Sequence, residues 1–285
     1  MIKSFGNLIN WNGRKRFYRQ KRFFVSLTNK QRGASMAGHC QTINLTTFSA
    51  NQADYVVDTF HITWQSVLLL TGRLYQRQKA TLVVTTKGQV LLICQPIHDV
   101  LKTFFEENCI GDVESRVYYK MLGMPRATRS AVAGKYQLVP TCGMSNDDVV
   151  WVMTHHLLHA ELAKPNDNGL RLQFDNVVTG VPLLVTLNYC GKSFIHNMEA
   201  ADKVAELQSE LLDFRQFCQG MTSARLKVTD YQQRRKLQKC LQEYQNLLCR
   251  HQHDLVMKQA FEQKSLSDLE RTIIHKLVFK PFAAF

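Results

Sequence analysis

The chain has 285 residues, 45% of them hydrophobic, and a formal net charge of +13 at pH 7. A chain of this size and composition can bury a core without the help of disulfides. Its longest apolar runs fall far short of the roughly 18–20 residues that a membrane-spanning helix requires, so the sequence predicts no transmembrane segment.

The charge is distributed unevenly along the chain. Nine Lys and Arg precede the first acidic residue, Asp54, whereas residues 54–221 hold 15 basic and 17 acidic side chains. Residues 222–285 are basic again, with 12 basic and 6 acidic side chains. A nearly neutral body between two basic segments is typical of proteins that bind a polyanion, most often a nucleic acid.

Residues 1–38 are predicted to form a flexible basic arm, because four glycines interrupt any long period. Residues 14–24 alternate cations with aromatic side chains, a mixture that suits phosphate contacts together with base stacking. A solvated tail, an extension upstream of a start at Met36 and a mitochondrial presequence fit the same residues. For the arm we predict these DNA contacts: Arg14, Arg16, Arg19, Lys21 and Arg22.

The first half of the body combines strands and helices. Residues 54–70 are predicted to be strand material with a short helix. Residues 80–95 predict a β-hairpin, since two runs rich in β-branched residues flank the turn at Lys87-Gly88. Apolar residues at helical spacing predict one helix over residues 97–108 and a second over residues 113–122.

Residues 125–196 are predicted to be rich in β-structure. Strands are expected at residues 136–140 and 149–158, and a second hairpin is expected from residues 169–175 and 181–189. With the helices, this gives an α+β fold class for the hairpin-rich body, residues 39–221. Three cations before and within this part are further predicted DNA contacts: Arg126, Arg129 and Lys135.

The C-terminal region is predicted to be helical and basic, with a domain boundary that leaves residues 222–285 outside the body. One amphipathic helix should start near a cap at Asn197 and stop at Gly220, and a second should follow at residues 229–262. A capping box at residues 267–270 predicts a last helix that ends near Val278. The second helix supplies the remaining predicted DNA contacts: Arg234, Arg235, Lys236 and Lys239.

Signals for catalysis or metal binding are weak. His155, His156 and His159 lie on an expected strand without a suitably placed glutamate, and we interpret them as structural histidines. Cys240, Cys249, His251 and His253 match no zinc-site spacing, and a Cys142/His155 nucleophile–base pair has no supporting motif. Eight cysteines without a Cys-x-x-Cys pair predict reduced thiols and a cytoplasmic location. We therefore expect no cofactor, no metal and no enzymatic activity.

Several segments between residues 115 and 197 resemble one family. These are residues 115–123, the Pro-Thr motif at residues 140–141, the strand that begins at Trp151, the hairpin at residues 172–188 and the polar segment 193–197. Together they resemble the competence transcription factor (ComK) family of Gram-positive bacteria. The chain is longer than typical members, its basic arm has no counterpart there, and residues 225–285 extend beyond the usual end.

The resemblance implies a transcriptional activator that switches on DNA-uptake genes. Family members bind AT-rich promoter boxes through the minor groove as multimers, with RNA polymerase and an adaptor–protease system as partners. The charge distribution agrees, because a narrow A·T minor groove attracts Arg and Lys. We therefore predict a homo-oligomeric activator that binds double-stranded AT-rich DNA and no membrane. An RNA- or ribosome-associated protein and a non-catalytic helical interaction protein remain alternatives.

Overall fold

A computed structural model describes residues 41–143, 146, 148–163, 168–175, 182–220 and 231–262, without the side chains of 231, 233, 257 and 259–262. The predicted α+β fold class is confirmed. The helices are α1 (Ile97–Glu107), α2 (Asp112–Met121), α3 (Gly191–Cys218) and α4 (Tyr231–Glu262), with two short 3₁₀ helices, η1 (Ala50–Gln52) and η2 (Thr154–His156). The strands are β1 (Gln41–Asn44), β2 (Tyr55–Val57), β3 (Val67–Tyr75), β4 (Gln78–Thr85), β5 (Val90–Ile93), β6 (Ala131–Ala133), β7 (Tyr136–Pro140), β8 (Val150–Met153), β9 (Leu157–Leu162), β10 (Leu170–Phe174) and β11 (Leu183–Leu187).

The larger sheet has seven strands in the order β2-β5-β4-β3-β8-β7-β6. Neighbouring strands are antiparallel except for β2 and β5, which run parallel. The predicted hairpin at residues 80–95 is confirmed as β4 and β5. Gly88 at its turn has a φ of 77°, a left-handed conformation that glycine adopts at little cost.

The smaller sheet has four strands in the order β1-β11-β10-β9. The second predicted hairpin is confirmed by β10 and β11, which pair antiparallel from Leu170 opposite Leu187 to Phe174 opposite Leu183. Strand β1 lies parallel to β11 and forms one edge of this sheet.

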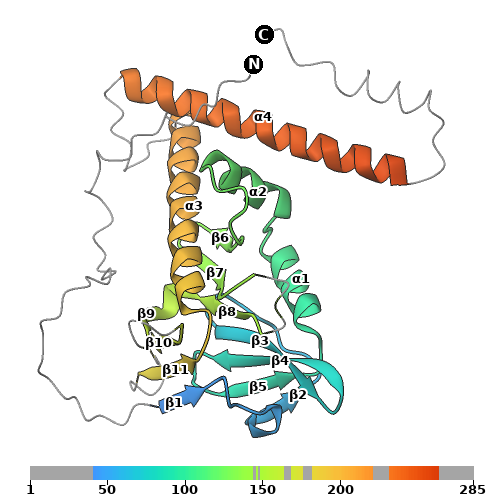
Figure 1. The fold of residues 1–285 in the computed structure, drawn as a ribbon. Helices are drawn as coiled ribbons and strands as arrows, with labels where there is room; N and C mark the ends of the chain where they lie inside the picture. Colours follow the sequence, from blue (N-terminus) through green and yellow to red (C-terminus); the bar gives the residue numbers. More distant parts are fainter. Residues whose placement is uncertain are drawn as a thin grey trace, which may run out of the picture.

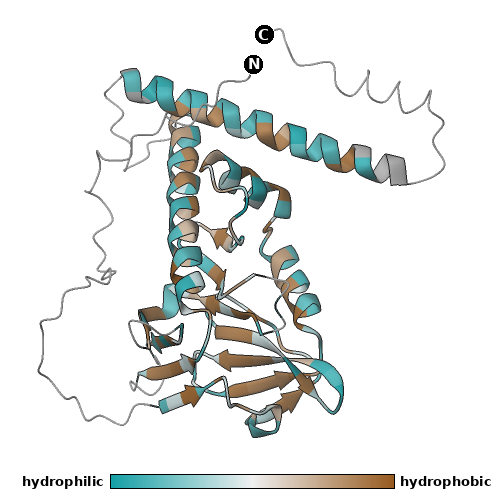
Figure 2. Cartoon of the chain, in the orientation of Figure 1, coloured by the Kyte–Doolittle hydropathy of each residue, from teal (hydrophilic) through white to brown (hydrophobic). Residues whose placement is uncertain are grey.

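The seven-stranded sheet lies between two cores (Figures 1 and 2). One face packs through Val150 and Val152 against the smaller sheet and the buried side of α3. The opposite face packs through Trp151 and Met153 against α1. Successive residues of a strand point to opposite faces, which is why four consecutive residues of β8 are all buried.

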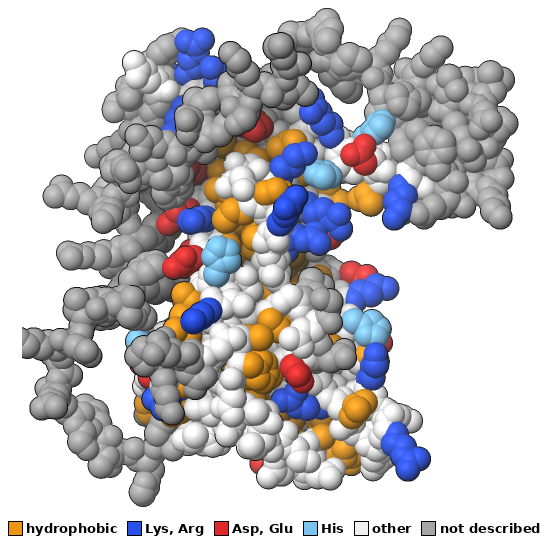
Figure 3. Space-filling model, viewed as in Figure 1, with side chains coloured by type: hydrophobic (Ala, Val, Ile, Leu, Met, Phe, Trp, Pro, Cys, Tyr) orange, Lys and Arg blue, Asp and Glu red, His pale blue; other side chains and the backbone are white. Residues whose placement is uncertain are grey.

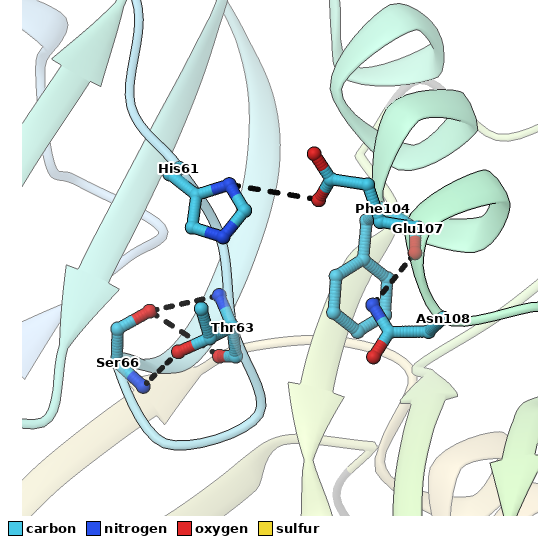
Figure 4. Close-up of polar contacts among 6 residues, drawn as sticks. All are labelled: His61, Thr63, Ser66, Phe104, Glu107 and Asn108. Atoms are coloured by element: carbon cyan, nitrogen blue, oxygen red, sulfur yellow. Dashed lines mark hydrogen bonds and ion pairs between the residues drawn. The ribbon is translucent and has the colours of Figure 1, made fainter.

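Two predictions about the strands and loops were wrong. The strand expected at residues 149–158 ends at Met153, because η2 turns the chain from the larger sheet into β9 of the smaller one. The short helix expected within residues 54–70 is absent from this fully described stretch. Instead, Thr63 and Ser66 close a turn in which each backbone N–H donates to the other side chain, at 2.9 and 3.1 Å (Figure 4).

The predicted cap of the long helix was also wrong. Helix α3 begins at Gly191, six residues before Asn197. Asn197 is 3% exposed and donates its side-chain N–H to the carbonyl of Pro140 at 2.9 Å. It therefore ties α3 to β7. The predicted stop is confirmed, because α3 ends at Cys218 and Gly220 has a φ of 73°.

Helix α4 confirms the second long helix and crosses the end of α3 (Figure 1). The helix expected at residues 267–278 and the arm at residues 1–38 lie outside the described residues. No helix in the described part of the chain is long and apolar enough to cross a bilayer.

Candidate nucleic-acid interface

The five predicted DNA contacts of the arm, Arg14, Arg16, Arg19, Lys21 and Arg22, lie outside the described residues. The candidate interface is therefore built from the other predicted cations, which lie between α2 and β7 and on α4. Figure 3 shows Lys and Arg side chains over α2 and along α4 on the face in view.

The cations between α2 and β7 differ in how freely they can meet a ligand. Arg126 is exposed and makes no ion pair with a described acid. The guanidinium of Arg129 lies 2.5 Å from the carboxylate of Asp112, which Arg116 also contacts at 2.7 Å. Lys135 is exposed and its ammonium lies 5.0 Å from the ring centre of Tyr136. Arg129 is thus committed to the fold, whereas Arg126 and Lys135 face solvent.

The start of α4 presents a basic face. Residues 231–242 contain four cations and no acid. Arg235 and Lys239 are one turn apart on the side opposite Leu237 and Tyr244, which are buried. Arg234 lies 4.9 Å from the ring centre of Phe217 at the end of α3. All four cations are exposed, so phosphates could reach Arg235 and Lys239 without any rearrangement of the fold.

Helix α4 is held in place by a small core that it shares with α2 and α3. Its buried residues are Val117 of α2, Leu207 and Leu211 of α3, and Tyr244 of α4. The ring of Tyr244 stacks on Tyr118 at 5.1 Å between centres, and its hydroxyl lies 3.3 Å from a carboxylate oxygen of Glu114.

The two tyrosines at this junction are uncharged over a wide pH range. Burial is the main cause that raises the pKa of Tyr118, followed by the hydrogen bond with Tyr244. Burial also raises the pKa of Tyr244. The two stacked rings that support α4 are therefore uncharged near neutral pH, although Glu114 and Arg215 contact Tyr244.

The two cation clusters contact α3 at different positions. The turn before Lys135 is tied to the middle of α3, where the backbone N–H of Gly134 donates to Gln208 at 3.0 Å. Arg234 contacts Phe217, nine residues further along the same helix. Nine residues are two and a half helical turns, so these two positions face opposite sides of α3.

The outer face of α3 is acidic. Five carboxylates follow one another at steps of three and four residues and so share one side of the helix. Burial raises the pKa of Glu206 above its usual value, and the negative charges of Asp202 and Glu210 add to this. A polyanion would be repelled from this face, which restricts binding to the other surfaces. The five residues are Glu199, Asp202, Glu206, Glu210 and Asp213.

Sequence reasoning missed a third basic element, the hairpin of β3 and β4. No acidic residue occurs between Asp58 and Asp99, whereas this stretch holds Arg73, Arg77, Lys79 and Lys87. The charge of residues 54–221 averages to nearly zero because the acids lie further along the chain. A shorter window along the sequence would have separated this basic stretch from the acidic α3.

The histidines of the body contribute to packing. The Nε2 atoms of His155 and His156 each lie 2.7 Å from the carbonyl oxygen of Trp64. The ring of His155 also packs at right angles to Tyr136, 5.0 Å between centres. His159 lies 3.4 Å from Glu161. Figure 4 shows the same loop held at a second point, where His61 lies 3.6 Å from Glu107 of α1.

The cysteines considered for catalysis or zinc binding are free thiols. Cys142 is buried beside Cys190. Burial, followed by the hydrogen bond with Cys142, raises the pKa of Cys190 to about 12, so this thiol stays protonated near neutral pH. Among the described residues, no group of three or more His, Cys, Asp or Glu side chains is placed to hold a metal ion.

Two of the five segments that carry the family resemblance, the Pro-Thr motif and the strand that begins at Trp151, lie next to each other in the larger sheet. Pro140 at the end of β7 is directly opposite Trp151 of β8. The hydroxyl of Thr141 accepts from the backbone N–H of Val150 at 3.0 Å and so extends this pairing. Comparisons of the chain with protein-family models, curated proteins and solved structures find no significant match.

Proposed function

We propose that the chain is a DNA-binding transcriptional activator of competence genes. It binds AT-rich promoter boxes as a homo-oligomer, through phosphate contacts and the minor groove. The observation that carries this proposal is the basic face of α4. There, Arg235 and Lys239 point away from the packed stripe, and no acid occurs within the first twelve residues of the helix.

Phosphate neutralisation supplies the affinity in this proposal. Each Lys or Arg that replaces a condensed counterion makes binding more sensitive to salt. The exposed side chains of Arg126, Lys135, Arg235 and Lys239 are placed for this role. Selectivity comes from groove shape, because the narrow minor groove of A-tracts concentrates negative potential.

The test is a binding titration of the full chain across a salt series, measured by fluorescence anisotropy. The probes are a duplex with spaced A- and T-tracts, its G·C counterpart, an I·C counterpart and a structured RNA. An I·C pair lacks the 2-amino group of guanine, so it keeps the minor-groove pattern of A·T but changes the major groove. We expect tight, salt-dependent binding to the A·T and I·C duplexes and weaker binding to the G·C duplex.

A matched pair of variants separates contact from overall charge. R235Q/K239Q and Q245E/Q252E each lower the net charge by two units through exposed side chains of α4, the second pair on a different side of the helix. Only the first should reduce the salt slope by about 2, because each lost phosphate contact removes about 0.9. Equal slopes for the two variants would remove α4 from the interface. Preference for RNA would favour the RNA-associated alternative, and absence of any binding at low salt would refute the proposal.

One observation favours a helical interaction protein as the second candidate. The far half of α4 exposes two neighbouring apolar residues, Leu255 at 46% and Val256 at 50%. Exposed apolar residues on a long helix are typical of surfaces that meet a partner helix. Self-association that is insensitive to salt, together with no affinity for nucleic acid, would support this second candidate.

A further inference from the structure

We infer that the tip of the β3–β4 hairpin is a DNA-inserting element, with Leu74 as an apolar wedge and Arg77 and Lys79 as flanking cations. The inference deepens the proposed function and depends on it, since the ligand is the same AT-rich duplex. None of these three residues is among the cations predicted from the sequence.

The hairpin extends beyond the strands on either side of it. Strand β8 pairs with β3 only at residues 69–71, and β5 pairs with β4 only at residues 81–84. Residues 72–80 therefore pair only with one another within the described chain. Figure 1 shows the two strands curling together past the rest of the sheet. A free two-stranded ribbon of this kind can enter a groove of DNA.

The two faces of the ribbon differ. One face rests on the protein, because Arg73 donates to the carbonyl of Leu45 at 2.8 Å and Tyr75 packs against the core. Leu74 is directly opposite Lys79 in the strand register, so the two share the other face. That face is open, with Leu74 72% exposed and Lys79 exposed.

Leu74 is unusually exposed for a large apolar side chain. Among the large hydrophobic residues exposed on the described surface, it has the greatest exposed fraction. Proteins that bind the minor groove insert leucine and similar side chains between base steps, which unstacks the bases and bends the duplex. The ammonium of the neighbouring lysine would then lie at the phosphates that line the groove.

The turn itself is held in an unfavourable conformation. Gln76 and Arg77 form a two-residue turn with φ values of 47° and 67°. Hairpins with both φ values positive normally use Asn-Gly or another glycine-containing pair. The chain instead retains a guanidinium and a side-chain amide at the tip, and both groups can bind in an A·T minor groove. Backbone strain of this kind is concentrated at functional sites.

The charge around the tip also fits a polyanion. Neither Arg77 nor Lys79 forms an ion pair with a described acid, and the nearest acids along the chain are Asp58 and Asp99. The hairpin thus projects from the sheet and combines the exposed apolar side chain of Leu74 with two cations that pair with no described acid. These are the features required to enter a groove and bend it.

The test uses the full chain and the A·T duplex, labelled at both ends for energy transfer and carrying 2-aminopurine at the central step. L74S should bind roughly tenfold more weakly, with less bending and less 2-aminopurine fluorescence, because burial of one leucine is lost. R77Q/K79Q should reduce the salt slope by about 2.

Two control variants match these changes elsewhere on the surface. L158S alters another exposed leucine, on β9, and K192Q/K203Q removes two exposed cations of α3. Both should bind and bend DNA as the wild type does. Circular dichroism and thermal melting check that every variant is folded.

The outcomes separate this inference from the proposed function. Wild-type bending by L74S, together with an unchanged salt slope for R77Q/K79Q, would overturn the inference and leave the proposed function standing. If the wild-type chain binds no duplex, both fail. Binding to phosphatidylserine vesicles that requires Leu74, without duplex binding, would assign the tip to a membrane surface and overturn the inference.

Discussion

Helices α3 and α4 are both long and both carry an apolar stripe, yet they are attached to the molecule in different ways. Helix α3 buries nine residues along its length, among them Phe194 and Phe214, against the sheets and its neighbours. The described side chains of α4 include only two that are buried, Leu237 and Tyr244. The first helix is part of the core, whereas the second rests on the core near its own start.

Their outer faces carry opposite charge. The exposed side of α3 holds five carboxylates at helical spacing, and the exposed start of α4 holds four cations without an acid. A helix built into the core can tolerate a repulsive outer face because burial holds it there. A helix attached at one junction is free to present its charge to a ligand. The charges that we propose to bind DNA therefore lie on an element that contributes little to the core.

The largest expected effect is a loss of stability that should be global for a variant of α3 and local for a variant of α4. F194A should lower the free energy of unfolding of the body by about 3–5 kcal/mol, because it leaves a cavity in place of a fully buried ring. Y244A should release α4 and leave the sheets intact. Hydrogen exchange would show this as faster exchange limited to the amides of α4. Equal loss of protection in the strands for both variants would show that α4 is as integral as α3.

The sequence predicted the elements whose signals are local. The β4–β5 hairpin follows from Lys87-Gly88, since glycine takes the positive φ that the turn requires. The β3–β4 hairpin was missed because its turn uses Gln76 and Arg77, which carry no turn signal. The hydrophobic spacing of α1, α2, α3 and α4 likewise needed no knowledge of tertiary contacts.

Contacts between distant residues explain the errors. The predicted strand at residues 149–158 breaks where His155 and His156 reach the carbonyl of Trp64, about 90 residues away in the chain. Asparagine is a residue type that often caps helices, but the side chain of Asn197 donates to the carbonyl of Pro140 inside the fold. For the interface, the sequence identified cations by clustering alone. It could not separate Arg129, which pairs with Asp112, from Arg126, which is free to bind.

The next largest effect concerns the junction between the acidic and the basic helix. Burial raises the pKa of the Cys240 thiol. The negative charges of Glu243 and Glu210 raise this pKa further, whereas the positive charge of Lys236 lowers it. Glu210 of α3 and Lys236 of α4 therefore act on the same thiol. K236E should therefore loosen α4 by up to about 1 kcal/mol, because it replaces a positive charge by a negative one in the surroundings of Glu210 and Glu243.

The double variant E210K/K236E tests whether this effect is specific. It should restore the protection of the α4 amides, measured by hydrogen exchange as a double-mutant cycle. A cycle in which the two changes simply add would show that the charges of α3 and α4 do not interact.

A smaller effect should distinguish an arginine that stabilises the fold, Arg129, from one that we propose to contact DNA, Arg126. R129Q should lower the melting temperature by about 1–2 °C, since Asp112 loses one of its two partners. R126Q should leave the melting temperature unchanged and weaken DNA binding with a smaller salt slope. D112N serves as the control and should lower the melting temperature at least as much as R129Q, because it breaks both pairs, without loss of DNA affinity. A lower melting temperature for R126Q, together with weaker DNA binding only by R129Q, would contradict the structure.

The smallest effect tests the repulsion on the outer face of α3. The pKa of Glu206 is raised above its usual value of 4.5, first by burial and then by the neighbouring carboxylates, so the folded chain holds this proton more tightly than the unfolded chain does. Stability must then fall as the pH rises through the window from the usual pKa to the raised one.

E206Q removes the charge and should raise the melting temperature slightly at pH 7, but not below about pH 4, where both states are protonated. Because the side chain is only partly buried, solvent screening keeps the gain small. A melting temperature that is unchanged at both pH values would mean that the carboxylates of α3 are too well screened to repel one another, and the acidic face would then also be a weaker barrier to a polyanion.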